Sequence, residues 1–155
     1  MSDYKKKSKL GAEALKCITD WMTEYNIKWR HATPEEQAHE IDIVAKKSYE
    51  VKHQTYPDSI CLEEISIRMP GKSDVPGWMY TSKADYLINV APDRKSFLKI
   101  NMQELKNVYI KIKRNYTLIW DSTDNGLRGD KWESAHRVIK VGTLEGYVKI
   151  IKVEV

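Results

Sequence analysis

Three side chains within residues 39–54 (HEIDIVAKKSYEVKHQ) have the types needed for metal-assisted phosphate chemistry: Asp42, Glu50 and Lys52. Two carboxylates held close together repel each other, and a hard divalent cation such as Mg²⁺, for which Mn²⁺ can substitute, relieves that repulsion. The backbone carbonyl of Val51 offers a further oxygen ligand. A bound ion activates water and polarises a phosphate, and an ammonium group stabilises the charge that develops. These parts suffice for hydrolysis of a phosphodiester.

A hairpin would bring these side chains together, and the segment has the pattern of two short strands around a polar turn. With Val44 paired near Ser48, Asp42 lies across from Glu50, where direct neighbours have Cβ atoms about 4.5–5.5 Å apart. Lys52 shares the face of Glu50, because side chains alternate along a strand. The alternative, an exposed hairpin face with an ordinary pattern of charges, stays open on the spacing alone.

Apolar periodicity and turn residues predict the elements around the hairpin. Apolar residues recur at helical spacing over 10–25 and over 101–114, and Thr33-Pro34-Glu35-Glu36 indicates a helix start or a turn. Residues 78–84 are expected to form a helical turn, and residues 122–132 a polar loop. Strands are expected at residues 41–44, 49–52, 60–67, 86–90, 117–120, 138–141 and 147–155. This order indicates an α/β (α+β) fold, a single domain with a central mixed β-sheet flanked by helices.

The arrangement resembles the PD-(D/E)XK nuclease superfamily, whose core places an acidic helix before a hairpin bearing Asp and then Glu-x-Lys. Glu50-Val51-Lys52 matches the (D/E)-x-K element, and Asp42 matches the upstream acid. Gln54, two residues after the lysine, recurs in several branches of that superfamily. The stretch GWMYTSKADYLINV, residues 77–90, is similar to a segment of small phage-type members. The resemblance covers residues 10–120, and residues 121–155 follow as C-terminal strands of unknown role.

The resemblance implies a restriction-endonuclease-like core and a metal-dependent endo- or exodeoxyribonuclease that uses Mg²⁺. It also implies a carboxylate on the first helix, for which Glu13 is the choice, although Asp20 and Glu24 lie on the same margin of the apolar stripe. In a strand, Glu63 and Glu64 must face opposite sides, so that one approaches the metal site and the other meets solvent. The alternative function is a catalytically inactive nuclease-fold module, such as a nucleic-acid-binding or anti-defence accessory protein.

The net charge of +4 permits a polyanionic partner without requiring one. The expected partner is DNA, while RNA and a homodimer stay open. Phosphate contacts are expected from a basic cluster on the second long helix and from one lysine before it, namely Lys106, Lys111, Lys113, Arg114 and Lys83. Residues 1–9 are expected to form a basic, flexible tail. Trp78 and Trp132 are the tryptophans expected at the surface, where they could stack on bases.

Several classes of protein are disfavoured by the sequence. No apolar run approaches the about 20 residues that span a membrane, and no secretory signal is evident, so a cytoplasmic location is expected, the host cytoplasm if the chain is phage-encoded. Cys17 and Cys61 are expected to be small buried hydrophobic residues. The four histidines show no zinc-ligand spacing with them. Motifs for binding nucleoside triphosphates are missing as well.

Overall fold

The computed structural model describes residues 3–56, 58–125 and 130–155. The first long helix, α1, runs from Asp3 to Glu24. Its apolar stripe is buried against sheet A through Ala14, Ile18 and Met22. The helix begins before residue 10, where the periodicity predicted its start, because polar lysines continue the helix without an apolar signal. The lysines expected in a separate tail therefore belong to α1.

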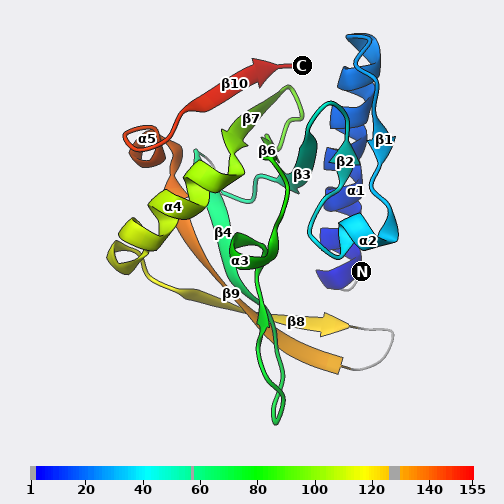
Figure 1. Ribbon diagram of the computed structural model, residues 1–155. Coiled ribbons are helices and arrows are strands. Elements are labelled where there is room, and N and C mark those ends of the chain that lie inside the picture. The colour runs from blue at the N-terminus through cyan, green and yellow to red at the C-terminus, as the bar shows by residue number, and fades with distance from the viewer. Residues whose placement is uncertain (1–2, 57, 126–129) are drawn as a thin grey trace.

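Sheet A has six strands in the order β1-β2-β3-β6-β7-β10. Strand β3 pairs with β6 in parallel, and the other neighbours are antiparallel, which confirms the expected mixed sheet. The two-residue strand β1 forms one edge of the sheet and lies beside α1, as Figure 1 shows. The strands span β1 Arg30–His31, β2 Ile43–Val44, β3 Ser48–His53, β6 Tyr86–Val90, β7 Ser96–Asn101 and β10 Ile150–Glu154.

Sheet B is antiparallel, in the order β5-β4-β9-β8, and the sequence did not predict it as a separate sheet. Its long strands β4 and β9 cross beneath sheet A, and β8 lies at the far edge (Figure 1). Strand β4 was expected, but its partner is β9, far along the chain, rather than a neighbour of the hairpin. The strands span β4 Ser59–Arg68, β5 Val75–Pro76, β8 Ile119–Asn125 and β9 Asp130–Lys140.

The main core fills the space between sheet A, sheet B and the helix α4, Met102–Ile112. Asn101 caps α4, since its side chain accepts a hydrogen bond from the Glu104 N–H. Leu62 of β4, Leu87 of β6 and Leu105 of α4 are all fully buried there. The two sheets and α4 thus share one core, and the chain forms one mixed α and β domain. A second cluster fills the opposite face of sheet A beneath α1.

Short helical turns complete the fold: α2 (Pro34–Gln37), α3 (Trp78–Thr81), the 3-10 turn η1 (Lys113–Asn115) and α5 (Val141–Leu144). Thr33 caps α2 in a capping box with Glu36, which confirms the predicted helix start. Cys17 and Cys61 are free thiols, half-buried rather than fully buried. Within the described part of the chain, no helix has the length and apolar character needed to cross a membrane.

Two expectations about the second half of the chain are wrong. Residues 122–132 were predicted to be a polar loop, but β8 continues to Asn125 and β9 begins at Asp130, and only 126–129 lie outside the described residues. Polar residues can pair along a hairpin without an apolar stripe, so periodicity gave no signal. Strand β7 was missed because it runs directly into the N-cap of α4, without a turn between them.

Candidate active site on the β2–β3 hairpin

The hairpin forms in the predicted register. Val44 pairs with Ser48 and Ile43 with Tyr49. Asp42 directly precedes the paired part of β2, and Glu50 directly follows Tyr49 on β3. The Asp42 N–H donates to the Tyr49 carbonyl (2.9 Å), and Asp42 Oδ2 accepts from the Val51 N–H (2.7 Å). The Asp42 carboxylate is thus held against the backbone of β3, which fixes its position next to the predicted catalytic strand.

Glu50 and Lys52 lie on the face of β3 that is turned toward α3 and sheet B. Glu50 is completely buried, and its Oε1 lies 2.7 Å from Lys52 Nζ. Lys52 keeps 36% of its side chain exposed and places Nζ 5.8 Å from the centre of the Trp78 ring. Within the described residues, neither Glu50 oxygen has a hydrogen bond of good geometry. A buried carboxylate in that condition requires a further partner, such as a cation or an ordered water.

Burial dominates the electrostatics of this pair. It raises the pKa of Glu50 to about 7, although Lys52 and Ser82 lower it and Glu40 raises it further. Burial also opposes the charge on Lys52, but Glu50, Asp42 and Glu40 together outweigh it and hold the pKa of that ammonium above its ordinary value. A lysine among carboxylates stays protonated, whereas Glu50 changes its protonation state near pH 7. Glu50 therefore takes up a proton near pH 7 unless a cation compensates its charge.

Two further carboxylates belong to this electrostatic cluster, and the sequence indicated only one of them. Glu63 of β4 is the member of the Glu63–Glu64 pair that approaches Lys52. Burial raises the pKa of Glu63, and the nearby Lys52 ammonium opposes this shift only in part. Glu40 influences Glu50, Lys52 and Glu63, and its own backbone has a φ of 57°. That left-handed conformation is uncommon outside glycine and turns the chain into the hairpin. The sequence carried no signal for it.

Glu64 does not meet solvent as expected, since it is 9% exposed. Its Oε1 accepts from the Tyr80 hydroxyl (2.7 Å) and from Lys113 Nζ (3.0 Å), and its Oε2 is paired with Arg137 Nη1. Arg137 also donates to the Tyr116 carbonyl and to the Tyr109 hydroxyl. This buried network ties β4 to α3, η1 and β9 on the side of sheet B opposite Glu63.

The segment after α3 supports the hairpin from below. The Lys83 N–H donates to the His39 carbonyl (2.9 Å), and Asp85 Oδ2 accepts from both the N–H (2.8 Å) and the hydroxyl (3.0 Å) of Ser48. Ser82 is buried next to Glu50. The stretch Thr81–Tyr86 thus has a physical role, because it locks the start of β3 and closes the base of the cluster. From the sequence, Ser82 was expected to be a surface residue that could reach a phosphate, but it is buried at 2% exposure.

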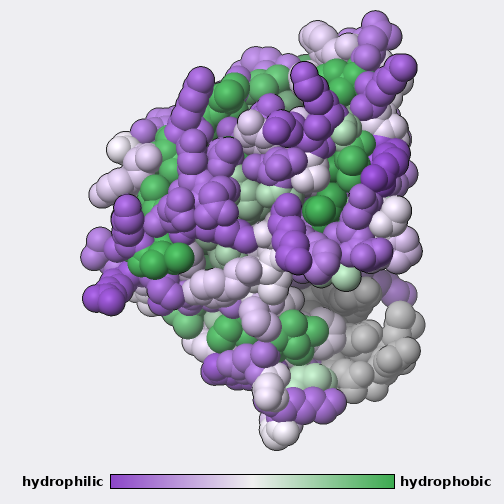
Figure 2. Space-filling model, viewed as in Figure 1, coloured by the Kyte–Doolittle hydropathy of each residue, from purple (hydrophilic) through white to green (hydrophobic). Residues whose placement is uncertain are grey.

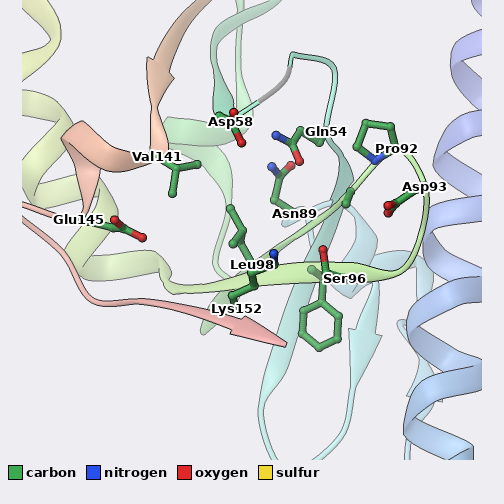
Figure 3. Close-up of a pocket in the computed structure, with 12 residues that line it drawn as sticks. Gln54, Asp58, Asn89, Pro92, Asp93, Ser96, Leu98, Val141, Glu145 and Lys152 are labelled. Carbon is green, nitrogen blue, oxygen red and sulfur yellow. The ribbon is translucent and has the colours of Figure 1, made fainter. Parts of the chain in front are cut away.

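Two residues of the predicted catalytic set lie elsewhere. Glu13 pairs with Arg94 Nη2 and lies 4.0 Å from Lys9 Nζ, in a surface depression along α1, so the choice of Glu13 for this cluster is wrong. Gln54 follows the end of β3 and donates from Nε2 to the Tyr56 carbonyl (2.9 Å). Gln54 and Asp58 line a separate pocket of about 470 Å³ (Figure 3). Because β3 ends at His53, the alternation of side chains along the strand does not extend to Gln54.

The predicted phosphate-binding residues fall into two groups. Lys106 donates a hydrogen bond to the Ser82 carbonyl and interacts electrostatically with Glu50. Lys113 donates a hydrogen bond to Glu64, so both lysines already have partners within the protein. The others, Lys83, Lys111 and Arg114, are exposed. Trp78 was expected at the surface but is 4% exposed, and Trp132 is half-buried. Only the exposed cations remain simple candidates for contacts with phosphates.

A pocket of about 430 Å³ opens beside the cluster, between α1, the end of β3 and sheet B. Lys52, Glu63 and Trp78 form its wall on the side of the cluster. The described residues contain no group of three or more His, Cys, Asp or Glu side chains arranged to hold a metal ion. Comparison with protein-family models, curated proteins and solved structures finds no match for this chain.

Proposed function

We propose that the chain is a divalent-metal-dependent nuclease that hydrolyses phosphodiester bonds in DNA at Asp42, Glu50 and Lys52. The observation that supports it is the buried Glu50 carboxylate, whose oxygens have no hydrogen bond of good geometry among the described residues. Asp42 lies close by, because its carboxylate accepts a hydrogen bond from the N–H of Val51, the residue after Glu50. Mg²⁺ takes one or two carboxylates and completes its shell with water or phosphate oxygens, so a set of two acids and the Val51 carbonyl is enough.

The chain's own residues would then have distinct tasks. Asp42 and Glu50 hold the ion at a fixed point, since the Val51 N–H orients one and burial immobilises the other. The ion, when bound, supplies a more acidic water and charge neutralisation on the phosphate. Lys52 reaches from the cluster into the adjoining pocket, where its ammonium can contact the water that attacks and the charge that develops. Its exposure gives it access that the buried Glu50 lacks.

The test is a cleavage assay on single-stranded, duplex and branched DNA with Mg²⁺ or Mn²⁺. Lys52→Ala should retain metal and DNA binding and lose about 10²-fold or more in rate, the order expected for removal of one preorganised charge. Asp42→Asn should weaken Mn²⁺ binding strongly in a calorimetric titration. Lys72→Ala is the matched control, because Lys72 is exposed in the β4–β5 loop and its loss changes the net charge equally.

The alternative of an inactive binding module predicts a different outcome. Wild-type protein would then bind DNA without cleaving any of the three substrates, and Lys52→Ala would behave as wild type in every assay. Cleavage that survives in Lys52→Ala would instead contradict the assignment of Lys52 and would direct attention to Glu40 and Glu63.

A further inference from the structure

The pocket beside Lys52 has polar features that the proposed metal cluster does not use. Its far wall is built by sheet B, where Asp121 of β8 and His136 of β9 face the pocket, and its rim includes Lys6 and Lys7 of α1. Its volume of about 430 Å³ falls within the range of sites that hold a small molecule or one nucleotide unit.

His136 presents a buried atom with no partner. The residue is 5% exposed, its Nδ1 lies 3.4 Å from Asp121 Oδ2, and its Nε2 has no hydrogen-bond partner among the described residues. Burial lowers the pKa of His136, Asp121 opposes this and Lys7 adds to it, so the neutral ring prevails. With its proton on Nδ1 toward the carboxylate, the ring offers the Nε2 lone pair as an acceptor.

Asn89 supplies a complementary donor. It is 3% exposed, lies on β6 between this pocket and the one that contains Gln54, and its Nδ2 has no hydrogen-bond partner among the described residues. An unpaired buried donor and an unpaired buried acceptor both disfavour an empty pocket. Together they fit a planar ligand that carries both an N–H and a carbonyl, as the edge of a nucleobase does.

The rim suits the backbone and the ring face of a nucleotide. Lys6 and Lys7 place two cations at the mouth, and Lys7 is near enough to influence His53, Glu63 and His136. Tyr56 is half-buried, and its ring centre lies 6.2 Å from that of His136. Cations near an aromatic ring are the combination with which proteins hold single strands.

We propose that this pocket binds one unpaired nucleotide of DNA beside the cluster of Asp42, Glu50 and Lys52, with His136 and Asn89 contacting the base edge and Lys6 and Lys7 the phosphates. The inference rests on the proposed function for the identity of the neighbouring site. Paired bases hide these edges within the duplex, so the pocket selects single-stranded DNA or a nucleotide turned out of the helix.

The experiment measures fluorescence anisotropy in EDTA, so that no metal takes part. The probes are fluorescein-labelled oligothymidine, a blunt duplex of equal length and an abasic strand of equal length. Oligothymidine should bind about tenfold or more tightly than either other probe. Tyr56→Ala should remove about tenfold of that affinity, and His136→Leu should abolish the preference over the abasic strand. Circular dichroism melting curves establish that each variant is folded.

A charge-matched pair of variants tests the rim. Lys6→Ala with Lys7→Ala should weaken binding of oligothymidine and lower its salt slope by about 1.4, whereas Lys16→Ala with Lys28→Ala should change neither. Equal affinity for all three probes, or oligothymidine affinity that these variants leave unchanged, would overturn the inference. Cleavage and Mn²⁺ binding are measured separately, so the two proposals can fail independently. Binding of oligothymidine without cleavage would refute only the proposed nuclease. Cleavage without a preference for single-stranded DNA would refute only the proposed nucleotide pocket.

Discussion

Glu50 is the residue in which fold stability and proposed function conflict. Its carboxylate is completely buried, and Lys52 Nζ lies 2.7 Å from it. A site that must bind a cation gains from charge that the fold has not neutralised, and the cost appears as reduced stability of the metal-free chain. That cost can be measured, because it depends on pH.

We predict that the change in the free energy of unfolding caused by Glu50→Gln is more favourable at pH 8 than at pH 4.5 in the metal-free protein. The folded-state pKa of about 7 lies above the ordinary value of 4.5, so the folded chain binds more protons between these values. Wild-type stability therefore falls as pH rises through this window, by up to about 3 kcal/mol, and the glutamine variant lacks that decline. Urea unfolding in EDTA measures it, with the exposed Glu35→Gln as control. Parallel pH profiles would contradict the prediction.

Glu64 shows the opposite sign. Burial disfavours its charge, but Tyr80, Lys113 and Arg137 outweigh burial and lower its pKa to about 2. The folded-state value lies below the ordinary 4.5, so the stabilisation is complete above pH 4.5 and is lost as pH falls toward 2. We predict that Glu64→Gln costs about 3 kcal/mol at pH 7 and little near pH 2. Denaturant unfolding across this range measures the effect, and a cost that persists at low pH would indicate packing instead.

At the scale of elements, Gly77 fixes how α3 sits on β4. A Cβ at Gly77 would lie 2.4 Å from the Glu63 carbonyl oxygen and 2.6 Å from its carbon, so backbone would have to move. Gly142, at the start of α5, has nothing within 4 Å of such a Cβ. This pair of glycines separates a close approach of two elements from the general effect of adding a methyl group.

We expect Gly77→Ala to destabilise the protein by about 1–3 kcal/mol, the usual cost of overpacking, and to displace Trp78 and Glu63 from the wall of the pocket. Thermal unfolding and tryptophan fluorescence measure the two effects. Gly142→Ala should leave both close to wild type. Equal behaviour of the two variants would show that α3 can shift without consequence.

The elements that the sequence could predict are those with local signals. The hairpin register followed from a polar turn between short apolar segments, and it brings the Asp42 carboxylate to the Val51 N–H of β3. The pairing of β4 with β9 has no local signal, since each strand's partner depends on a contact between distant parts of the chain. The same limit explains why the sequence could not decide which of Glu63 and Glu64 approaches Lys52, since that depends on how sheet B lies against sheet A.

Glu13 illustrates a different limit. The amphipathic pattern placed it on the margin of the apolar stripe, where it pairs with Arg94. However, α1 packs on the face of sheet A that carries Val51, and Glu50 and Lys52 lie on the other face. Arg94 comes from the β6–β7 turn, and β7 was itself missed. A residue's role in a cluster therefore could not be predicted without the element that supplies its competing partner.

At the scale of the whole molecule, the hydrophilic surface is broken only by small, separate hydrophobic patches on the face shown in Figure 2. Nothing on that face marks a surface for a second copy of the chain, and the homodimer stays a prediction. Charge is distributed unevenly with respect to the cluster. Lys47, Lys83 and Lys106 line one pocket at the base of the hairpin, while Lys111 and Arg114 lie at the other end of α4.

We predict that Lys47→Ala with Lys83→Ala weakens DNA binding and lowers the salt slope by about 1.4 to 1.8, one phosphate contact for each lysine. Lys111→Ala with Arg114→Ala removes the same charge farther from Glu50 and should change the slope little. Binding isotherms at several salt concentrations measure both. A larger loss of DNA affinity in the Lys111→Ala, Arg114→Ala variant would instead support phosphate contacts at the surface of α4, as the sequence predicted.

Strand β4 lies between β3 and β6 in the sequence, yet it leaves sheet A and pairs with β9. The parallel β3–β6 pair can therefore close only around a long excursion, and folds with such distant contacts form slowly. Glu50 is fully buried only once β6 and sheet B have packed against the hairpin, and we expect that packing to be completed after the rate-limiting barrier. A cation that needs the finished cluster should then slow unfolding and leave the refolding rate nearly unchanged. In a chevron plot, the cation should therefore lower the unfolding arm and leave the refolding arm unchanged.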